Sequence, residues 1–442
     1  MPRPPPTIGR MRIMADTGDL FYSVEDLKLD HADGIYRSGE TLVLTGTLFR
    51  SGRPVVGGAV RILLKWEGSE IGTTDIPCTG APFLFTYRSD KPGWIYFGIQ
   101  VLDAEGKVVD HPAREIPQAR KRLLVDEIGA IYEPEKIRFL GEAPADLKEF
   151  WAEERRKLDR VPFDTVIEPL DSPDPAVELH SVTVQAGVDR PVTAYLAFPK
   201  GAAPGSLPAY VEFLSHCWSD AHSEFAINAA KRGALGLAAT WHGFPVGRDT
   251  AFYEGCAKYF DERGGLGDRE KWSFHDVLIR TLRALDYVKS RPEWNRRDLI
   301  VQGGSLGGGE TAVAAAFDPA VTLALIAVCS FCEFDGRPAG RAMRRNIGDA
   351  SPEILRALSY YDVCNLTPLF HCESYFCTGY ADEACHPSKV LAAYNNLPTE
   401  LKKGFYGNPR TGHYGTTKNL VGNERIARFF RETTVGLYPE PV

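Results

Sequence analysis

Five glycines surround Ser305 in the segment VQGGSLGGGE, residues 301–310. The apolar run DLIVQGG (298–304) is typical of a strand, and the small residues of GGETAVAAAF (308–317) are typical of a helix. A strand that enters a helix through Gly-x-Ser-x-Gly must turn sharply, and glycines on either side of the serine let the two elements pack closely. We therefore predict that Ser305 is a nucleophile held on a tight turn; a flexible glycine-rich loop is the alternative.

A serine hydroxyl needs a base, and the base needs an orienting acid. Three histidines follow Ser305, and His413 lies in the glycine-bearing loop RTGHYGTT late in the chain. This is the place expected for a base carried on a loop. His371 directly precedes a strand and His386 precedes a proline at the start of a helix, so structural roles fit these two better. We predict that His413 is the base.

The acid is expected between the nucleophile and the base along the chain. Asp382 comes just after the strand ESYFCTG (373–379), at the strand end where α/β proteins build their sites. Its neighbour Glu383 is a rival, and an ordinary solvated carboxylate is the alternative for either residue. We predict that Asp382 is the acid.

Two backbone N–H groups are expected to bind the oxyanion of an ester transition state. One should belong to Leu306, which follows the nucleophile, and the other to the loop after an earlier strand. The strand PAYVEFLS (208–215) is followed by such a loop, and we place the second donor at Trp218 or Cys217. His216 could shape this loop through hydrogen bonds.

Aromatic residues accompany these predicted site residues. Rings with an exposed face can stack on sugars, whereas buried rings belong to a core or a lid. Both interpretations are open for four of them: Trp218, Trp241, Phe244 and Trp272.

The chain has 442 residues, of which 44% are hydrophobic and 25% charged, enough for two or three domains. Short runs rich in β-branched and aromatic residues fill 20–125, separated by turn signals, and predict a β-sandwich of immunoglobulin type. This domain could bind a ligand, but a structural cap is the interpretation we favour. We expect a disordered tail over 1–19, a linker over 126–144 and a catalytic domain over 145–437. In the last, strands alternate with helices, which predicts a mostly parallel sheet covered on both faces.

The motifs together resemble the acetyl xylan esterase and cephalosporin C deacetylase family, the seventh family of carbohydrate esterases. The similar segments are GGSLGGG, GYADEACHPSKVLAAYNNL, LSYYDVCNL and Gly412-His413-Tyr414, within about 140–435. The resemblance implies an α/β-hydrolase fold, a Ser305-Asp382-His413 triad and an oxyanion donor at Trp218.

The chain also departs from the family pattern. The family's R-G-Q motif is absent from the loop TWHGFPVGRD (240–249), and Leu306 stands where the family has glutamine. The predicted β domain is an addition to the usual pattern. The family commonly assembles as a hexamer, so a homo-oligomer is open for this chain. The departures leave the triad intact and place the identity of the substrate in question.

Charge and hydropathy exclude other partners. The net charge of −7 argues against a nucleic-acid partner, and no apolar stretch is long enough for a membrane helix. The first residues carry basic side chains but no apolar segment, so we expect no signal peptide there; the compartment stays open. The pair Cys329 and Cys332 lacks a second pair at zinc-site spacing, and we read it as two buried small residues.

The sequence predicts a two-domain serine esterase that hydrolyses short acyl esters, acetyl groups on sugars or oligosaccharides foremost, and needs no metal or organic cofactor. A peptidase, or an esterase for uronate or larger acyl esters, is the alternative within the enzymes. A non-catalytic carbohydrate-binding protein on a hydrolase fold is the alternative outside them.

Overall fold

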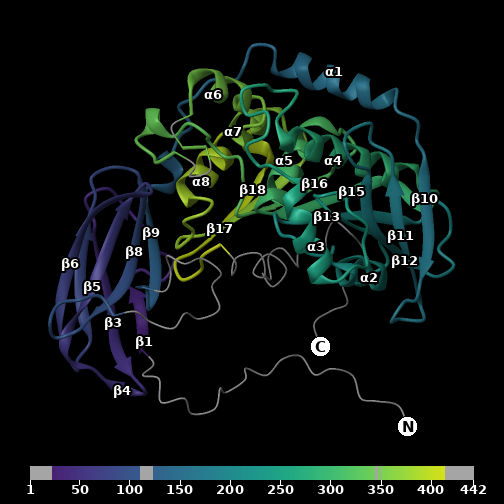
Figure 1. The fold of residues 1–442 in the computed structure, drawn as a ribbon. Coiled ribbons are helices and arrows are strands. Elements are labelled where there is room, and N and C mark those ends of the chain that lie inside the picture. The colour runs from purple at the N-terminus through teal and green to yellow at the C-terminus, as the bar shows by residue number, and fades with distance from the viewer. Residues whose placement is uncertain (1–21, 110–122, 344–346, 349, 414–442) are drawn as a thin grey trace, which may run out of the picture.

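The computed structural model of the protein describes residues 22–109, 123–343, 347–348 and 350–413 (Figure 1). These residues form an all-β region followed by a larger α/β region. The tail expected at 1–19 and the part of the expected catalytic domain after residue 413 lie outside the described residues.

The β region consists of two sheets that share one hydrophobic core. In the first sheet β3 pairs with β1, β4 and β7, and the second has the order β2-β9-β8-β5-β6. Alternate residues of β3 are buried, and its Leu42 and Leu44 share a core with Ile62 and Phe97 of the second sheet. The strands are β1 (Tyr22–Leu29), β2 (Ile35–Tyr36), β3 (Thr41–Arg50), β4 (Arg53–Pro54), β5 (Val56–Trp66), β6 (Ser69–Thr79), β7 (Phe83–Arg88), β8 (Gly93–Leu102) and β9 (Asp126–Tyr132).

Strand β9 corrects the predicted linker at 126–144. Residues 126–132 pair antiparallel with β8 and parallel with β2, so they complete the second sheet. The segment DEIGAIY has the β-branched and aromatic residues of a strand, and its last five residues are buried. The β region therefore extends beyond residue 125. Its immunoglobulin-like character stays a prediction.

The α/β region contains a nine-stranded sheet with the order β10-β11-β12-β14-β13-β15-β16-β17-β18. The first four strands pair antiparallel, and all pairs from β14 to β18 are parallel. The strands are β10 (Thr165–Leu170), β11 (Val177–Val184), β12 (Val192–Pro199), β13 (Leu207–Phe213), β14 (Leu235–Ala239), β15 (Trp294–Gly304), β16 (Leu323–Ala327), β17 (Glu373–Gly379) and β18 (Lys402–Asn408).

Helices cover both faces of this sheet, as the sequence predicts. Along β13, Val211 packs into the core that contains α4, α5 and α8, whereas Tyr210 faces the side covered by α2. The helices are α1 (Leu147–Asp159), α2 (Ser223–Lys231), α3 (Thr250–Cys256), α4 (Ser273–Ser290), α5 (Leu306–Phe317), α6 (Pro352–Ser359), α7 (Val363–Leu366) and α8 (Pro387–Asn395). The architecture is that of an α/β-hydrolase.

The strand order brings the predicted site residues together. The chain runs from β13 to β14 on one side and then to β15 on the other, so the loops after β13 and β15 leave the sheet in opposite directions. Ligands of open α/β sheets bind in the crevice that such a reversal creates. Phe213 at the end of β13 lies opposite Gly303 near the end of β15, which places the loop containing Trp218 beside Ser305.

Within the described part of the chain, no helix is long and apolar enough to cross a membrane, and no cluster of side chains has the composition of a metal site. All nine cysteines are free thiols, and Cys329 and Cys332 are buried.

Candidate active site

Ser305 sits between the end of β15 and the start of α5 with φ 55° and ψ −116°, a region that non-glycine residues rarely adopt. The flanking glycines explain how the turn closes. A Cβ on Gly303 would lie 2.2 Å from the carbonyl oxygen of Gly307, and one on Gly307 would lie 2.2 Å from that of Phe213. The glycines therefore allow a strained turn to close between a strand and a helix. The structure contains this turn and not a flexible glycine-rich loop.

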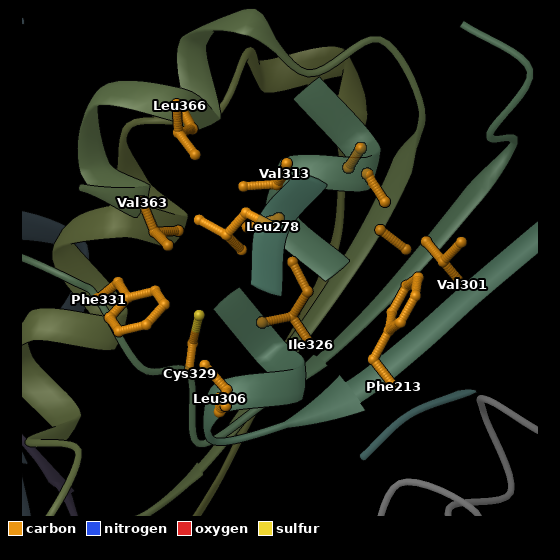
Figure 2. Close-up of a cluster of buried hydrophobic side chains, with 14 of the residues drawn as sticks. Phe213, Leu278, Val301, Leu306, Val313, Ile326, Cys329, Phe331, Val363 and Leu366 are labelled. Atoms are coloured by element: carbon orange, nitrogen blue, oxygen red, sulfur yellow. The ribbon is translucent and has the colours of Figure 1, made fainter. Parts of the chain in front are cut away.

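Leu306 anchors the start of α5. Its side chain is buried in the hydrophobic cluster with Cys329, Phe331 and Val313 (Figure 2). Only its backbone N–H is therefore left to serve the site. The exchange of the family's glutamine for leucine places an apolar side chain in the core and leaves this backbone donor in place.

The three residues predicted as nucleophile, base and acid lie in hydrogen-bonding contact. His413 Nε2 is 3.0 Å from Ser305 Oγ, and His413 Nδ1 is 2.9 Å from Asp382 Oδ2. The second oxygen of Asp382 accepts hydrogen bonds from the backbone N–H groups of Ala384 and Cys385 at 2.8 and 2.9 Å. Asp382 is fully buried, so these bonds fix the carboxylate that faces the imidazole.

These loops meet because β17 and β18 are parallel neighbours. Gly379, the last residue of β17, lies opposite Asn408, the last residue of β18, so the loops that follow both strands start side by side. The Ala381 N–H then donates to the Thr411 carbonyl at 3.0 Å and ties the loop of Asp382 to the loop of His413.

The rival candidates have other partners. Glu383 forms an ion pair with Lys65 of the β region. His371 Nε2 lies 2.8 Å from the Asp318 carbonyl, and the His386 ring packs against Trp94 with centroids 4.9 Å apart.

The loop after β13, which contains Trp218, is tied to the strand that leads to Ser305. Ser215 Oγ donates to the Gly304 carbonyl at 2.8 Å and fixes this loop to the residue before the nucleophile. Among the described residues, no group accepts a hydrogen bond from the backbone N–H of Trp218 or Leu306. Both donors are thus available to a ligand, whereas the Cys217 N–H is bonded to the Ser215 carbonyl at 2.7 Å. Of the two predicted positions, Trp218 is the one that can donate.

Two contacts of the loop after β13 escape sequence reasoning. Trp241 Nε1 donates to the Cys217 carbonyl at 2.8 Å, and His242 Nε2 lies 3.0 Å from the Ser219 carbonyl. Burial lowers the pKa of His242 to about 4, so this imidazole is neutral and donates from Nε2. These two residues occupy the loop in which R-G-Q is absent.

A third missed residue is Ser330, which follows β16. Its N–H donates to the Ser305 carbonyl at 2.9 Å, and its Oγ lies 3.4 Å from Ser305 Oγ. Ser330 is buried and supports the strained turn from the side opposite the loop after β13. A serine without a motif around it carries no signal in the sequence that could have revealed this role.

The predicted aromatic residues separate into two groups. Trp241 and Trp272 are 0% and 3% exposed and pack inside an aromatic core. Neither ring has a face that a sugar could reach, so both are core residues. Trp218 and Phe244 are half-buried, with ring centroids 6.4 Å apart. The guanidinium of Arg190 lies 4.5 Å from the centre of the Phe244 ring.

Burial also decides the state of a neighbouring thiol. Cys217 is adjacent to Trp218, and burial raises the pKa of its thiol, which therefore stays protonated at neutral pH. Ser305 Oγ, by contrast, lies 3.0 Å from an imidazole nitrogen, Nε2 of His413.

The fold and the contacts of Ser305 define the class of the protein as an α/β-hydrolase with a serine on a strand–turn–helix elbow. A family model described as acetyl xylan esterase (AXE1) matches residues 131–429, well over half of the chain. The chain therefore belongs to the acetyl xylan esterase family and is a carboxylic ester hydrolase, which confirms the resemblance seen in its motifs.

Individual esterases are also similar to this chain in sequence or in fold. The acetyl esterase Axe7A of Xylanibacter ruminicola is 25% identical over 413 residues, which cover 88% of this chain and 86% of that protein. An acetyl xylan esterase from Paenibacillus sp. R4 superposes with a TM-score of 0.58 at 22% identity over 68% of this chain and 98% of its own. Acetyl xylan esterase 1 from Thermoanaerobacterium sp. JW/SL YS485 gives a TM-score of 0.55 at 20% identity over 70% of this chain and 98% of its own.

Proposed function

We propose that the protein removes acetyl groups from carbohydrate esters through a Ser305-His413-Asp382 triad and an acyl-enzyme intermediate. The observation that carries this proposal is the hydrogen-bonded series from Ser305 Oγ through His413 to Asp382, placed at the elbow of a member of the acetyl xylan esterase family.

In the first half-reaction Ser305 Oγ attacks the ester carbonyl while His413 Nε2 accepts its proton. Asp382 Oδ2 accepts from Nδ1, which selects the tautomer with a free Nε2 lone pair and stabilises the imidazolium. The imidazolium then protonates the departing sugar hydroxyl. In the second half-reaction His413 activates a water that hydrolyses the acyl-enzyme and releases acetate.

The oxyanion of both tetrahedral intermediates would be bound by the N–H groups of Leu306 and Trp218. Leu306 N is the first N–H of the 12-residue helix α5, so the positive end of the helix dipole adds to its effect. Loss of one donor of this kind typically costs 10²- to 10³-fold in kcat. Both donors are backbone groups, which explains how the site tolerates leucine at position 306.

The sugar part of the substrate would contact the aromatic residues next to Trp218. Phe244 lies 6.3 Å from Phe252 and 6.4 Å from Tyr259 between ring centroids. Phe252 and Tyr259 are exposed, Tyr259 at 61%. Such rings offer apolar faces to the C–H faces of pyranose or furanose units. We assign the leaving sugar to this aromatic surface. We assign an acetyl group as the acyl part of the ester because Axe7A, a relative aligned over 88% of this chain, is named an acetyl esterase.

The test compares hydrolysis of p-nitrophenyl acetate, butyrate and octanoate by the wild type and by Ser305→Ala. We expect activity confined to the acetate and a loss of about 10³-fold or more in the variant, because the attacking atom is absent. Acetylated xylo-oligosaccharides and cephalosporin C then define the natural leaving group.

Other outcomes would change the proposal in defined ways. Full activity of Ser305→Ala would show that Ser305 is not the nucleophile. Faster hydrolysis of octanoate would point to larger acyl esters, and cleavage of a methyl uronate or a peptide in place of acetate would favour the remaining alternatives.

A further inference from the structure

The β region contacts the two loops that carry the acid and the base. We define the acid loop as residues 380–386, around Asp382, and the base loop as residues 409–413, which end at His413. In Figure 1, β8 and β9 lie on the side of the β region that faces β17 and α8.

The acid loop is bonded to the β region on both sides of Asp382. Before it, Trp94 Nε1 of β8 donates to the Tyr380 carbonyl at 2.7 Å. After it, Glu383 forms its ion pair with Lys65 of β5. Trp94 is fully buried, so its indole N–H is satisfied by the Tyr380 carbonyl and not by solvent water.

The base loop is bonded to the neighbouring strand of the same sheet. Gly129 N–H of β9 donates to the Pro409 carbonyl at 3.0 Å, and Asp126 of β9 pairs with Arg410 at 3.0 Å. The approach is close: a Cβ on Gly129 would lie 1.8 Å from the Tyr380 carbonyl oxygen of the acid loop. One strand of the β region therefore touches both loops.

A buried carboxylate fixes this arrangement from the β5–β6 turn. Glu67 is 3% exposed and accepts hydrogen bonds from the Trp94 N–H at 2.7 Å and from Ser388 Oγ at 2.5 Å. Arg341, itself paired with Glu333, lies 3.3 Å from the second Glu67 oxygen. The turn is thus attached to α8, the helix that directly follows the acid loop.

From these contacts we infer that the β region is a positioning element of the active site, which holds the acid and base loops at the separation that the Asp382–His413 hydrogen bond requires. The inference rests on the proposed function, since it gives Asp382 and His413 their catalytic roles. The physical reason is that the two loops leave separate strands, and a shift of about 1 Å in a catalytic group can cost 10²-fold in rate. Trp94 and Lys65 act through the loops and are positioning residues.

The first test is Trp94→Phe, which removes the indole N–H and keeps a buried aromatic ring. Trp151→Phe is the matched control, because Trp151 is equally buried and donates to a carbonyl, that of Tyr360 at 2.9 Å, far from the two loops. At a temperature where both variants keep the near-ultraviolet circular dichroism of the wild type, we expect Trp94→Phe to lower kcat on p-nitrophenyl acetate at least tenfold with KM changed less than twofold. Trp151→Phe should stay within twofold of wild type in both constants.

The second test exchanges the charges of the Lys65–Glu383 pair. Lys65→Glu and Glu383→Lys should each lower kcat several-fold, because like charges would then push the acid loop away from β5. The double variant Lys65→Glu with Glu383→Lys restores an attractive pair, and we expect it to recover most of the lost kcat. If the losses of kcat in the two single variants simply add in the double variant, the inference for this contact is overturned.

A readout separate from ester turnover distinguishes the failure of this inference from failure of the proposed function. A fluorophosphonate probe reacts with Ser305 at a rate that reports its activation by His413. If the folded wild type is not labelled at Ser305, the proposed function fails. If Ser305 is labelled equally fast in wild type and Trp94→Phe, the function stands and the positioning role is wrong.

Discussion

At the residue scale, the direction of one peptide unit matters most for the oxyanion site. The Cys217 carbonyl and the Trp218 N–H belong to the same trans peptide, so they point in opposite directions. Trp241 Nε1 donates to that carbonyl at 2.8 Å, and the Trp241 carbonyl in turn accepts from Arg280 Nη2 at 2.9 Å. The indole bond therefore fixes the orientation of this peptide, whose N–H is the proposed second oxyanion donor.

Trp241→Phe tests this orientation. We expect kcat for p-nitrophenyl acetate to fall about 10- to 100-fold with little change in KM, because the lost hydrogen bond matters when negative charge develops on the oxyanion. Steady-state kinetics provide the measurement. Trp294→Phe is a suitable control, since it removes a comparable bond to the Asp298 carbonyl at 3.0 Å at the beginning of β15. Equal kinetics for both variants would show that the indole bond has no catalytic consequence.

Residue patterns reveal only part of such a site. Ser305, Asp382 and His413 stand out in the sequence because each needs a turn or loop with recognisable glycines and a fixed order along the chain. Trp241 has no such signal, because its function depends on a carbonyl 24 positions earlier that only the fold brings within reach. The same holds for Trp94, whose partner Tyr380 is 286 positions away.

At the element scale, helices α1 and α4 are joined by a buried charged group. His275 of α4 lies 3.0 Å from Glu154 of α1 and 3.1 Å from Asp276, while Lys157 also pairs with Glu154. Burial by itself would lower the pKa of His275, but the hydrogen bonds to Asp276 and Glu154 raise it to about 9. The imidazolium is thus the form that the folded protein prefers.

This preference links stability to pH. Because the pKa rises from 6.5 in the unfolded chain to about 9 in the fold, the stabilisation is complete below about pH 6.5 and disappears as pH rises through 9. At about 1.4 kcal/mol per pKa unit, we expect at most about 3 kcal/mol. Urea denaturation of wild type and His275→Gln at pH 6 and pH 10 measures it: the variant should be less stable at pH 6, with the gap closing at pH 10. A gap independent of pH would contradict the prediction.

Elements were predictable where their period was regular. The amphipathic pattern of α4 and the alternation of β11 and β12, which form a hairpin, can both be recognised in the sequence. Strand β9 was missed because residues 103–125 separate it from β8 in sequence, although the two strands pair directly in the sheet. Sheet partners depend on contacts distant in sequence, which a local pattern does not encode.

At the scale of the whole molecule, the contacts between the β region and the α/β region include a buried charged cluster. Glu67, Arg341, Glu333 and Lys389 are all buried, and Lys389 Nζ donates to the Glu333 carbonyl at 2.9 Å. Separation of the two regions would expose these groups and the Trp94 indole together. We therefore regard the regions as one thermodynamic unit, in contrast to the loosely joined domains common in chains of this length.

Differential scanning calorimetry tests this view. We expect one transition for the wild type, with the calorimetric and van't Hoff enthalpies in agreement. Glu67→Ala leaves Arg341 with one carboxylate partner fewer, and the transition should shift to lower temperature and broaden or split. Asp75→Asn, which breaks the exposed pair with Arg61 inside the β region, should leave its shape unchanged. Two resolved transitions in the wild type would contradict the single unit.

The linear order of these parts has a consequence for biosynthesis. The β region is translated first, then the strand and helix around Ser305, and His413 follows more than one hundred residues later. Because synthesis proceeds from the N-terminus, a nascent or prematurely terminated polypeptide can contain the whole β region and Ser305 while it still lacks His413. On the proposed mechanism such incomplete chains hydrolyse no ester, and activity begins only after translation has passed residues 409–413, which pair with β9 in the complete fold.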